Sequence, residues 1–251
     1  MLDPALRATF EACLDAARRG DAPALAACFQ EDAEGLESLS GEARGAQALA
    51  EAVAALKARI PDLELTPLRT YGEGPELAVR LRLSGRGREA EGVWAFRFDG
   101  EGRITRLVAL FEPARLLSVS ASSLSKRQEE RIIDYFRTYN SDEEDAHMSL
   151  ASPKLVYFGA VSRMTAEGIE TARGVFRSAR TRMGLKRFDP MKVFGSGPYA
   201  AVLVRIYGSQ AGGPTEEGIW VLRFDAEDRF DRVSILWNPG SFLSWPMKPG
   251  A

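Results

Sequence analysis

Hydrophobic and polar residues alternate along neighbouring segments in the first half of the chain, and this alternation predicts β-strands. The segments cover residues 62–72, 76–84, 90–98 and 103–112, and glycine-rich turns such as DGEG separate them. Side chains of a strand point alternately to opposite faces, so the pattern fits a sheet with one buried face. Because the segments are consecutive and their turns are short, we expect an antiparallel meander.

Helices are predicted ahead of these strands, where apolar residues recur with helical spacing. The first helix is expected to end near Arg19, the second to start after the N-cap residue Asp21, and the third to stop at Pro61. A short strand is expected near Leu36. Helices gathered at the start of a domain can cover one face of an antiparallel sheet, which gives an α+β fold.

The chain contains this arrangement twice. EGVWAFRFDGEGRITRLVALFEP (91–113) returns as EGIWVLRFDAEDRFDRVSILWNP (217–239), offset by 126 residues, with about half of the positions identical. Upstream the offset is 123 residues, and the helical segment 45–59 aligns with 168–182. A repeat of this length predicts two copies of one domain. The expected boundaries are a first domain at 1–117, a linker at 118–126, a second domain at 127–246 and a tail at 247–251.

Composition supports two ordinary globular domains and excludes several partners. The chain has 251 residues, of which 27% are charged, and a net charge of −2. This balance gives no broad attraction to nucleic acid or to a membrane surface. Neither a signal peptide nor an apolar run of the ~20 residues that a spanning helix needs is found, so we expect a soluble, cytoplasmic protein.

Metal and disulfide chemistry are not expected either. The only cysteines are Cys13 and Cys28, which are predicted to be a reduced, buried pair. The single histidine, His147, follows acidic residues in SDEEDAHM and is expected on an exposed helical face, in a helix that Ser141 and Glu144 would cap. One histidine and two distant cysteines give no metal-ligand spacing, so no metal and no cofactor are predicted.

Two stretches of the first copy carry a resemblance to a known superfamily. They are GDAPALAACFQEDAEGLESLSGEARGAQALAEAV after the first helix and the closing FRFDGEGRITRLVALFEP. The chain resembles the SnoaL-like polyketide cyclases and ketosteroid isomerases, which have the nuclear transport factor 2-like, or cystatin-like, fold, and the second copy resembles them too. The resemblance implies two tandem cone-shaped α+β barrels, each with three helices packed on a curved antiparallel sheet. Members commonly pair through the outer sheet face, so the tandem chain is expected to form an internal pseudodimer, and further oligomerisation stays open.

The resemblance also places candidate catalytic residues. The isomerases use a tyrosine on the first helix, an acidic base on the strand after the second helix, and an acid on the strand that bears RFD. In the first and second copies, respectively, the tyrosine's place holds Cys13 and Tyr135, and the base's place holds Glu37 and Gly159. The place of the acid holds Trp94 and Trp220. Neither copy has the full set, and this argues against isomerase chemistry of that type.

Two of these residues are candidates for chemistry, each with a structural alternative. In an apolar cone, Glu37 would have a raised pKa and could act as a general base, whereas on an exposed strand edge it would be solvated. Tyr135 shares a helix face with Tyr139 and could orient a ligand carbonyl or hydroxyl, or both could be packing residues. Six residues are predicted to line a ligand pocket or to fill it: Cys13, Trp94, Phe111, Tyr139, Trp220 and Trp237.

Two functions from different classes remain. The first is binding of a small apolar or aromatic molecule in one or both cones, with non-metal acid–base chemistry as isomerase, cyclase or lyase left open. The second is a noncatalytic structural or protein-interaction module in which side chains fill both cones. Because the polar residues of the two copies differ, we expect at most one copy to hold a functional site.

Overall fold

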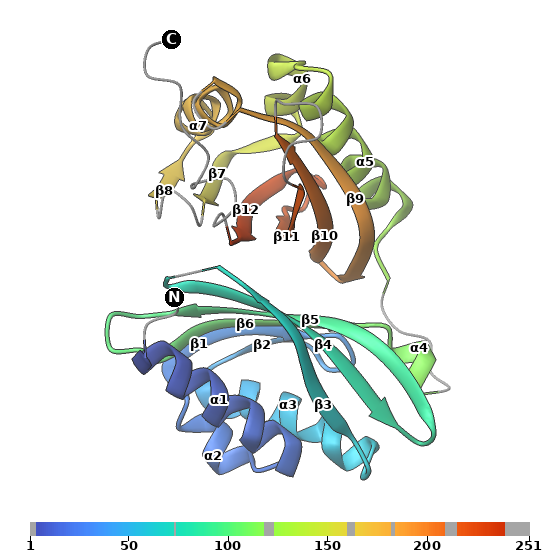
Figure 1. Ribbon diagram of the computed structural model, residues 1–251. Helices are drawn as coiled ribbons and strands as arrows, with labels where there is room; N and C mark the ends of the chain where they lie inside the picture. The colour runs from blue at the N-terminus through green and yellow to red at the C-terminus, as the bar shows by residue number, and fades with distance from the viewer. Residues whose placement is uncertain are drawn as a thin grey trace. The chain divides into compact units, whose positions relative to one another are not determined.

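The computed structural model of the protein divides into two compact units near Leu124 (Figure 1). The structure describes residues 4–72, 74–117, 123–159, 164–181, 184–208 and 215–238. The predicted linker lies partly outside these residues and the predicted tail lies wholly outside them. The domain boundaries and the pseudodimer therefore stay predictions.

Helices come first in the first unit, and a mixed sheet follows. The helices are α1 (Pro4–Arg19), α2 (Ala22–Ala26), α3 (Ala46–Arg59) and the short α4 (Pro113–Leu116). Within the described residues the sheet has six strands in the order β2-β1-β6-β5-β4-β3. The strands are β1 (Phe29–Glu37), β2 (Gly41–Arg44), β3 (Glu64–Tyr71), β4 (Glu76–Gly85), β5 (Arg88–Phe98) and β6 (Ile104–Phe111).

The second unit repeats this plan. Its helices are α5 (Lys126–Asn140), α6 (Glu144–Ser149) and α7 (Ile169–Thr181). In the part of the chain that is described, its six strands have the equivalent order β8-β7-β12-β11-β10-β9. The strands are β7 (Ala151–Gly159), β8 (Met164–Glu167), β9 (Leu185–Ser196), β10 (Tyr199–Gly208), β11 (Thr215–Phe224) and β12 (Phe230–Trp237). The tandem α+β architecture expected from the sequence is confirmed.

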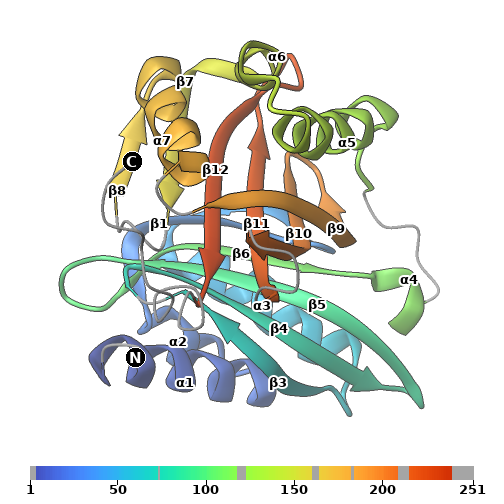
Figure 2. The same ribbon diagram turned by 45° about the horizontal axis from the view of Figure 1, so that its top comes forward.

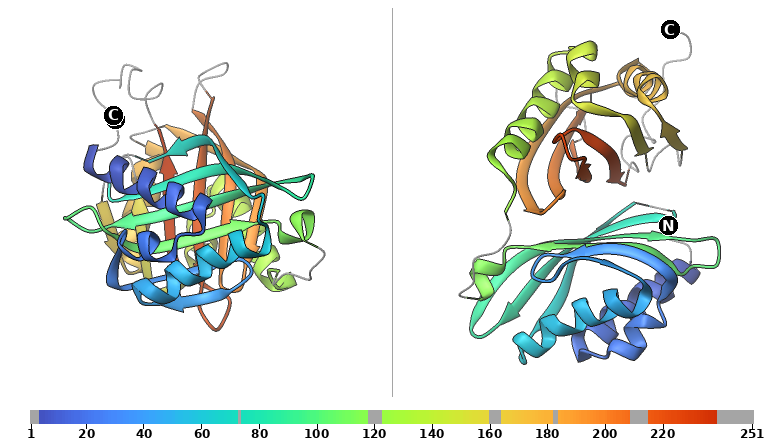
Figure 3. Two further views of the ribbon diagram at one scale, coloured as in Figure 1. Left: turned by 90° about the horizontal axis from the view of Figure 1, so that it is seen from below. Right: turned by 180° about the vertical axis from the view of Figure 1, so that it is seen from behind.

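Each unit has one hydrophobic core between its helices and its sheet. Figure 3 shows α1 and α3 lying across the strands of the first sheet, and Figure 2 shows α5 and α7 beside the strands of the second. The first core contains Cys13, Trp94 and Phe111, and the second core contains Trp220 and Trp237. The alternation of large apolar residues along β5 and β11 therefore directs one row of side chains toward the helices.

The expectation of an entirely antiparallel sheet is wrong for one pair of strands in each unit. β1 pairs in parallel with β6, and β7 pairs in parallel with β12, whereas the meander β3–β6 and the pair β11–β12 are antiparallel. Alternation of residue types shows which face of a strand is buried, but it does not show the direction of a neighbour that is distant in sequence. Glu37 pairs with Ala109 and Gly159 pairs with Ile235, so these two register positions are equivalent in the two units.

The repeated RFD motif forms the same tight turn in both units. Asp99 Oδ1 accepts hydrogen bonds from the backbone N–H groups of Glu101 and Arg103, each at 2.9 Å. Asp225 Oδ1 accepts the same bonds from Glu227 and Arg229, again at 2.9 Å. Aspartate favours such turns because its carboxylate can satisfy nearby backbone donors. The geometry of this turn explains why the RFD motif occurs in both units.

One helix cap differs from the sequence expectation. The capping box predicted at Ser141 and Glu144 is wrong, because α6 starts after Glu143 and has no side-chain cap. The capping box belongs to α5, where Ser125 Oγ accepts from the Gln128 N–H at 3.1 Å and the Gln128 side chain accepts from the Ser125 N–H at 2.9 Å. Both segments have the Ser-x-x-Glu/Gln spacing, and only one of them is used.

Replacing Gly174 with alanine should stabilise the protein. Gly174 lies in the interior of α7, and a Cβ atom added there meets no other atom within 4 Å. Alanine in a helix interior is favoured over glycine by about 0.5–1 kcal/mol. Urea unfolding of Gly174→Ala should show an increase of that size in the free energy of unfolding. A decrease would show that this position needs the freedom of glycine.

No helix in the described part of the chain is both long enough and apolar enough to span a membrane.

Candidate functional site

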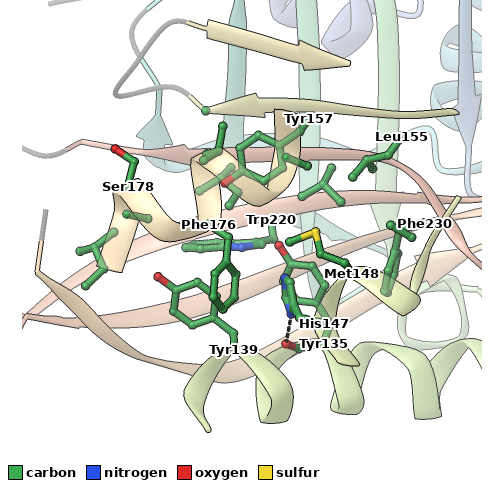
Figure 4. A pocket seen from close by; sticks show the side chains of 18 of the residues that line it. Tyr135, Tyr139, His147, Met148, Leu155, Tyr157, Phe176, Ser178, Trp220 and Phe230 are labelled. Carbon is green, nitrogen blue, oxygen red and sulfur yellow. Dashed lines mark hydrogen bonds between the residues drawn. The ribbon is translucent and has the colours of Figure 1, made fainter. Parts of the chain in front are cut away.

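The second unit contains a cavity of about 400 Å³ between its helices and its sheet (Figure 4). Its walls come from α5, α6 and α7 and from strands of the second sheet, and most of them are aromatic or aliphatic side chains. Among the described residues that line the cavity there is no Lys, Arg, Asp or Glu. The cavity is therefore an apolar chamber with a few polar side chains.

Helices α3 and α7 occupy equivalent places in the two units. Each follows a glycine with positive φ, Gly45 at 94° and Gly168 at 80°. In each, the fourth residue after the glycine donates its N–H to the glycine carbonyl at 3.1 Å, as Leu49 does to Gly45 and Ala172 does to Gly168. The offset of 123 residues found in the sequence therefore holds in the structure, and the two helices can be compared residue by residue.

Two core-facing side chains on this helix are smaller in the second unit, whereas Phe176 there is larger than the equivalent Val53. In α3, Leu49 and Leu56 are almost fully buried, with 1% and 2% of their surfaces exposed, and both belong to the first core. The equivalent residues of α7 are Ala172 and Ala179, and both line the cavity. Replacing leucine by alanine on a core-facing surface leaves a void unless the surroundings collapse into it.

Aromatic rings make a continuous wall on one side of the cavity. The ring of Tyr139 stacks on Phe188 with 4.2 Å between centroids, and Phe176 meets Tyr139 edge-on at 5.0 Å. Phe188 in turn meets Trp220 at 4.9 Å. Such ring pairs hold one another in place, so this wall presents a rigid apolar surface to a ligand.

Two polar groups in this wall have no hydrogen-bond partner among the described residues. They are the Tyr139 hydroxyl and the Trp220 indole N–H, and both atoms are buried. Burial raises the pKa of Tyr139 well above its usual value, against the opposing charge of Arg180. Burial, together with the neighbouring Tyr139, also raises the pKa of Tyr135, against the opposing effect of the nearby Trp220 indole N–H. The phenols therefore stay protonated at neutral pH and can donate hydrogen bonds.

The single histidine lies in this site, which corrects the expectation of an exposed position. His147 in α6 is 7% exposed, lines the cavity, and packs its ring against Tyr135 with 4.4 Å between centroids. Burial lowers the pKa of His147 to about 4, against the hydrogen bond with the Tyr135 carbonyl, and the charge of Arg180 adds to the lowering. The ring is therefore uncharged at neutral pH, whereas acidic neighbours on an exposed helical face would have favoured the imidazolium.

The cavity brings together four candidates proposed from the sequence and adds two residues that were not proposed. Tyr135, Tyr139, Trp220 and Trp237 all line it, together with His147 and Tyr157. Figure 4 shows Tyr135 and Tyr139, both from α5, around one space with His147 from α6 and Tyr157 from β7.

A signal for His147 was present in the sequence. The offset of 122 residues that places Tyr135 on Cys13 also places His147 on Leu25, which is completely buried in the first core. The neighbouring acidic residues conceal this equivalence.

The remaining candidates lie in the first unit. Cys13, Trp94 and Phe111 are packed in the first core, and Cys28 joins Cys13 there as a second free cysteine. The Trp94 indole N–H is buried without a hydrogen-bond partner among the described residues.

Glu37 is buried and caps the turn that follows it. Its Oε2 atom accepts hydrogen bonds from the N–H groups of Leu39 at 3.1 Å and Ser40 at 2.9 Å, whereas Oε1 has no partner within the described residues. Burial raises the pKa of Glu37, against the hydrogen bonds from Ser40 and Leu39 and the charge of Arg59. The solvated alternative is therefore wrong, but half of the carboxylate is occupied in holding the chain.

No group of three or more His, Cys, Asp or Glu side chains in the described ranges is arranged to hold a metal ion.

Helix α6, which carries His147, is fastened to α7 by a carboxylate clamp. Glu144 accepts hydrogen bonds from Arg177 at 2.7 Å through each of its two oxygens, and from Arg173 at 2.6 Å. The bonds from Arg177 and then Arg173 lower the pKa of Glu144 to about 2. Bidentate arginine pairs of this kind fix the geometry of the two partners.

The Glu144 clamp should make the protein sensitive to acid. A lowered carboxylate pKa contributes stability that is complete above the ordinary glutamate value and is lost as the pH falls toward 2. Glu144→Gln should therefore lower the melting temperature at neutral pH, and the difference from the unchanged protein should vanish near pH 2. Melting curves across this range test the expectation. If the difference in melting temperature is the same at neutral pH and near pH 2, the Glu144 clamp is not its cause.

Comparison with known proteins supports the superfamily that the sequence resembles. Residues 10–107 match the model of a family described as SnoaL-like domain. This match and the strand order shared by both units confirm the resemblance to the SnoaL-like, nuclear transport factor 2-like superfamily. No curated protein matches the chain.

Several solved structures are similar to about half of the chain. One is an NTF2-like protein of unknown function from Cytophaga hutchinsonii, with 12% identity, coverage of 46% of this chain and 94% of its own, and a TM-score of 0.39. A ketosteroid isomerase-like protein from Catenulispora acidiphila, in complex with trimethylamine, has 14% identity, coverage of 46% and 90%, and a TM-score of 0.41. A putative polyketide cyclase from Sinorhizobium meliloti has 27% identity, coverage of 40% and 92%, and a TM-score of 0.36.

Proposed function

We propose that the second unit binds a small apolar or aromatic molecule inside its cone. The observation that carries this proposal is the apolar cavity of about 400 Å³ in that unit. Ligand sites are typically cavities of about 300–1,000 Å³ with apolar walls and a few placed polar groups. The unpartnered Tyr139 hydroxyl and Trp220 N–H are polar groups of this kind.

The tyrosines of this site act as donors in the proposed function. A phenol with a raised pKa keeps its proton at neutral pH, so Tyr135 and Tyr139 can orient an oxygen of the ligand but cannot serve as bases. Acid–base catalysis in the second unit would need a different proton acceptor.

A structural role is the better proposal for the first unit. Its α3 helix presents two leucines where α7 presents alanines, and its candidate residues Cys13, Trp94 and Phe111 are core residues. A feature that points to chemistry there is the Oε1 atom of Glu37, which has no hydrogen-bond partner within the described residues. We therefore rank a general-base role for Glu37 below ligand binding in the second unit.

Ligand screening on the whole chain tests the proposed function. Thermal shift and tryptophan fluorescence would be measured with steroids, polyketide-like aromatic compounds and fatty compounds. A compound that binds the second cone should lose affinity in Trp220→Phe and keep it in the matched variant Trp94→Phe. If no compound in the panel changes either signal, or if only Trp94→Phe weakens binding, the second cone is not the site.

A further inference from the structure

The orientation of the His147 ring is set by contacts behind the cavity. Its Nδ1 atom lies 3.1 Å from the Tyr135 carbonyl oxygen and 3.0 Å from Thr138 Oγ1. A carbonyl oxygen only accepts, so Nδ1 must carry the hydrogen. The Thr138 hydroxyl donates to the Asp134 carbonyl at 2.7 Å, which leaves its oxygen free to accept from Nδ1.

This tautomer leaves the other ring nitrogen as an acceptor. In neutral imidazole one nitrogen donates and the other accepts, so Nε2 of His147 carries a lone pair. Nε2 makes no hydrogen bond within the described residues, and the ring is part of the cavity wall. The low pKa of about 4 keeps the ring uncharged at neutral pH.

The cavity also holds donors on other elements. Trp220 Nε1–H, on β11, can only donate, and the Tyr139 hydroxyl, on α5, can donate or accept. Neither has a partner in the described part of the chain. Each unsatisfied buried polar group costs about 1–3 kcal/mol, so a ligand that forms hydrogen bonds with these groups should bind more tightly than one that leaves them unpaired.

The charge of a ligand is restricted as well. Arg180 lies 5.2 Å from the Tyr139 ring centroid, but it is not among the described lining residues and is paired with Asp142 at 2.6 Å. With no charged side chain among the described lining residues, a ligand carboxylate or ammonium would be buried without a counter-ion, which is strongly unfavourable.

We infer that His147 makes the cavity selective for uncharged, hydroxyl-bearing aromatic or alicyclic molecules. The ligand hydroxyl donates to His147 Nε2, while Trp220 Nε1–H and the Tyr139 hydroxyl donate to oxygen on the same ligand. This inference rests on the proposed function and specifies the class of ligand. His147 is a specificity-determining residue in this account, and no bond is made or broken.

Three probes of similar size separate the inference from the proposed function. They are 2-naphthol, 2-methylnaphthalene and 2-naphthoate, titrated calorimetrically into the full chain at neutral pH. We expect 2-naphthol to bind about 10- to 100-fold more tightly than 2-methylnaphthalene, and 2-naphthoate to bind more weakly than both. In His147→Phe this preference should fall at least severalfold while 2-methylnaphthalene still binds, because only the donors Trp220 Nε1–H and Tyr139 remain for the ligand oxygen.

The outcomes are distinct. If both neutral probes bind equally to the unchanged protein, or if His147→Phe keeps the preference, the inference is wrong and the proposed function stands. If neither neutral probe binds, the inference and the proposed function are both wrong for molecules of this size.

A measurement that needs no variant gives an independent test. Because the chain has a single histidine, its ring ¹⁵N signals can be assigned without ambiguity. They should report an Nδ1–H tautomer, and Nε2 should shift with 2-naphthol but not with 2-methylnaphthalene. An Nε2–H tautomer, or equal shifts with both probes, would overturn the inference even if His147→Phe failed to fold.

Discussion

Replacing Ala172 and Ala179 together with leucine should close the cavity of the second unit and weaken ligand binding at least tenfold. The double variant restores the residues that α3 has at the equivalent positions, where Leu49 and Leu56 pack in the first core. Filling a cavity commonly stabilises a protein by about 0.5–2 kcal/mol, so the melting temperature should rise while binding is lost. Loss of binding together with higher stability distinguishes a filled site from a damaged fold.

The reverse changes in the first unit are the matched control for this experiment. Leu49→Ala and Leu56→Ala should each lower the free energy of unfolding by about 2–5 kcal/mol, as truncation of a buried leucine does. They should leave ligand affinity unchanged wherever the protein remains folded. Unaltered affinity in the Ala172→Leu, Ala179→Leu variant would contradict the assignment of the site to this cavity.

Gly35→Ala should be among the most destabilising single-methyl additions in the chain. A Cβ atom built at Gly35 lies 2.0 Å from the Leu107 carbonyl oxygen and 3.0 Å from Cδ2 of Leu49. The first neighbour is backbone of β6, paired with β1, so relief requires one strand to move. Overpacking in a core typically costs about 1–3 kcal/mol and sometimes more, and we expect about 3 kcal/mol or more here.

Chemical denaturation of Gly35→Ala beside Gly74→Ala checks this expectation. An added Cβ at Gly74 meets nothing within 4 Å, and its φ is not in the left-handed region, so that variant should unfold like the unchanged protein. Equal stability of the two variants would show that β1 and β6 are not held as closely as described. In the second unit the equivalent register position is Tyr157, which lines the cavity.

Much of the fold could be predicted because its determinants are local. The alternation in residues 90–98 and the repeated RFD turn define β5, β11 and their hairpins. Internal repetition adds long-range information, because two segments with one pattern must make one structure. The parallel partner of β1 could not be predicted in this way. β6 is separated from β1 by most of the first unit, and no local pattern reports the direction of a distant neighbour.

The site was harder to predict because it depends on differences between the copies. The aromatic residues Tyr139 and Trp220 are visible in the sequence, but whether such rings fill a cone or line it depends on the residues opposite them. Here the deciding residues are Ala172 and Ala179, which are unremarkable in composition and informative only beside Leu49 and Leu56. His147 was misjudged for a related reason, since its acidic neighbours in sequence face away from the ring that it presents to the core.

The indole ¹⁵N–¹H signals of the tryptophans test the central claim most directly, because Trp94 and Trp220 are equivalent residues in the two cones. They would be assigned with Trp94→Phe and Trp220→Phe and followed while a neutral aromatic compound such as 2-naphthol is titrated into the full chain. The account predicts a saturable shift of the Trp220 signal with the Trp94 signal unmoved. A shift of Trp94 alone, or no shift of Trp220 with any compound that binds, would contradict it.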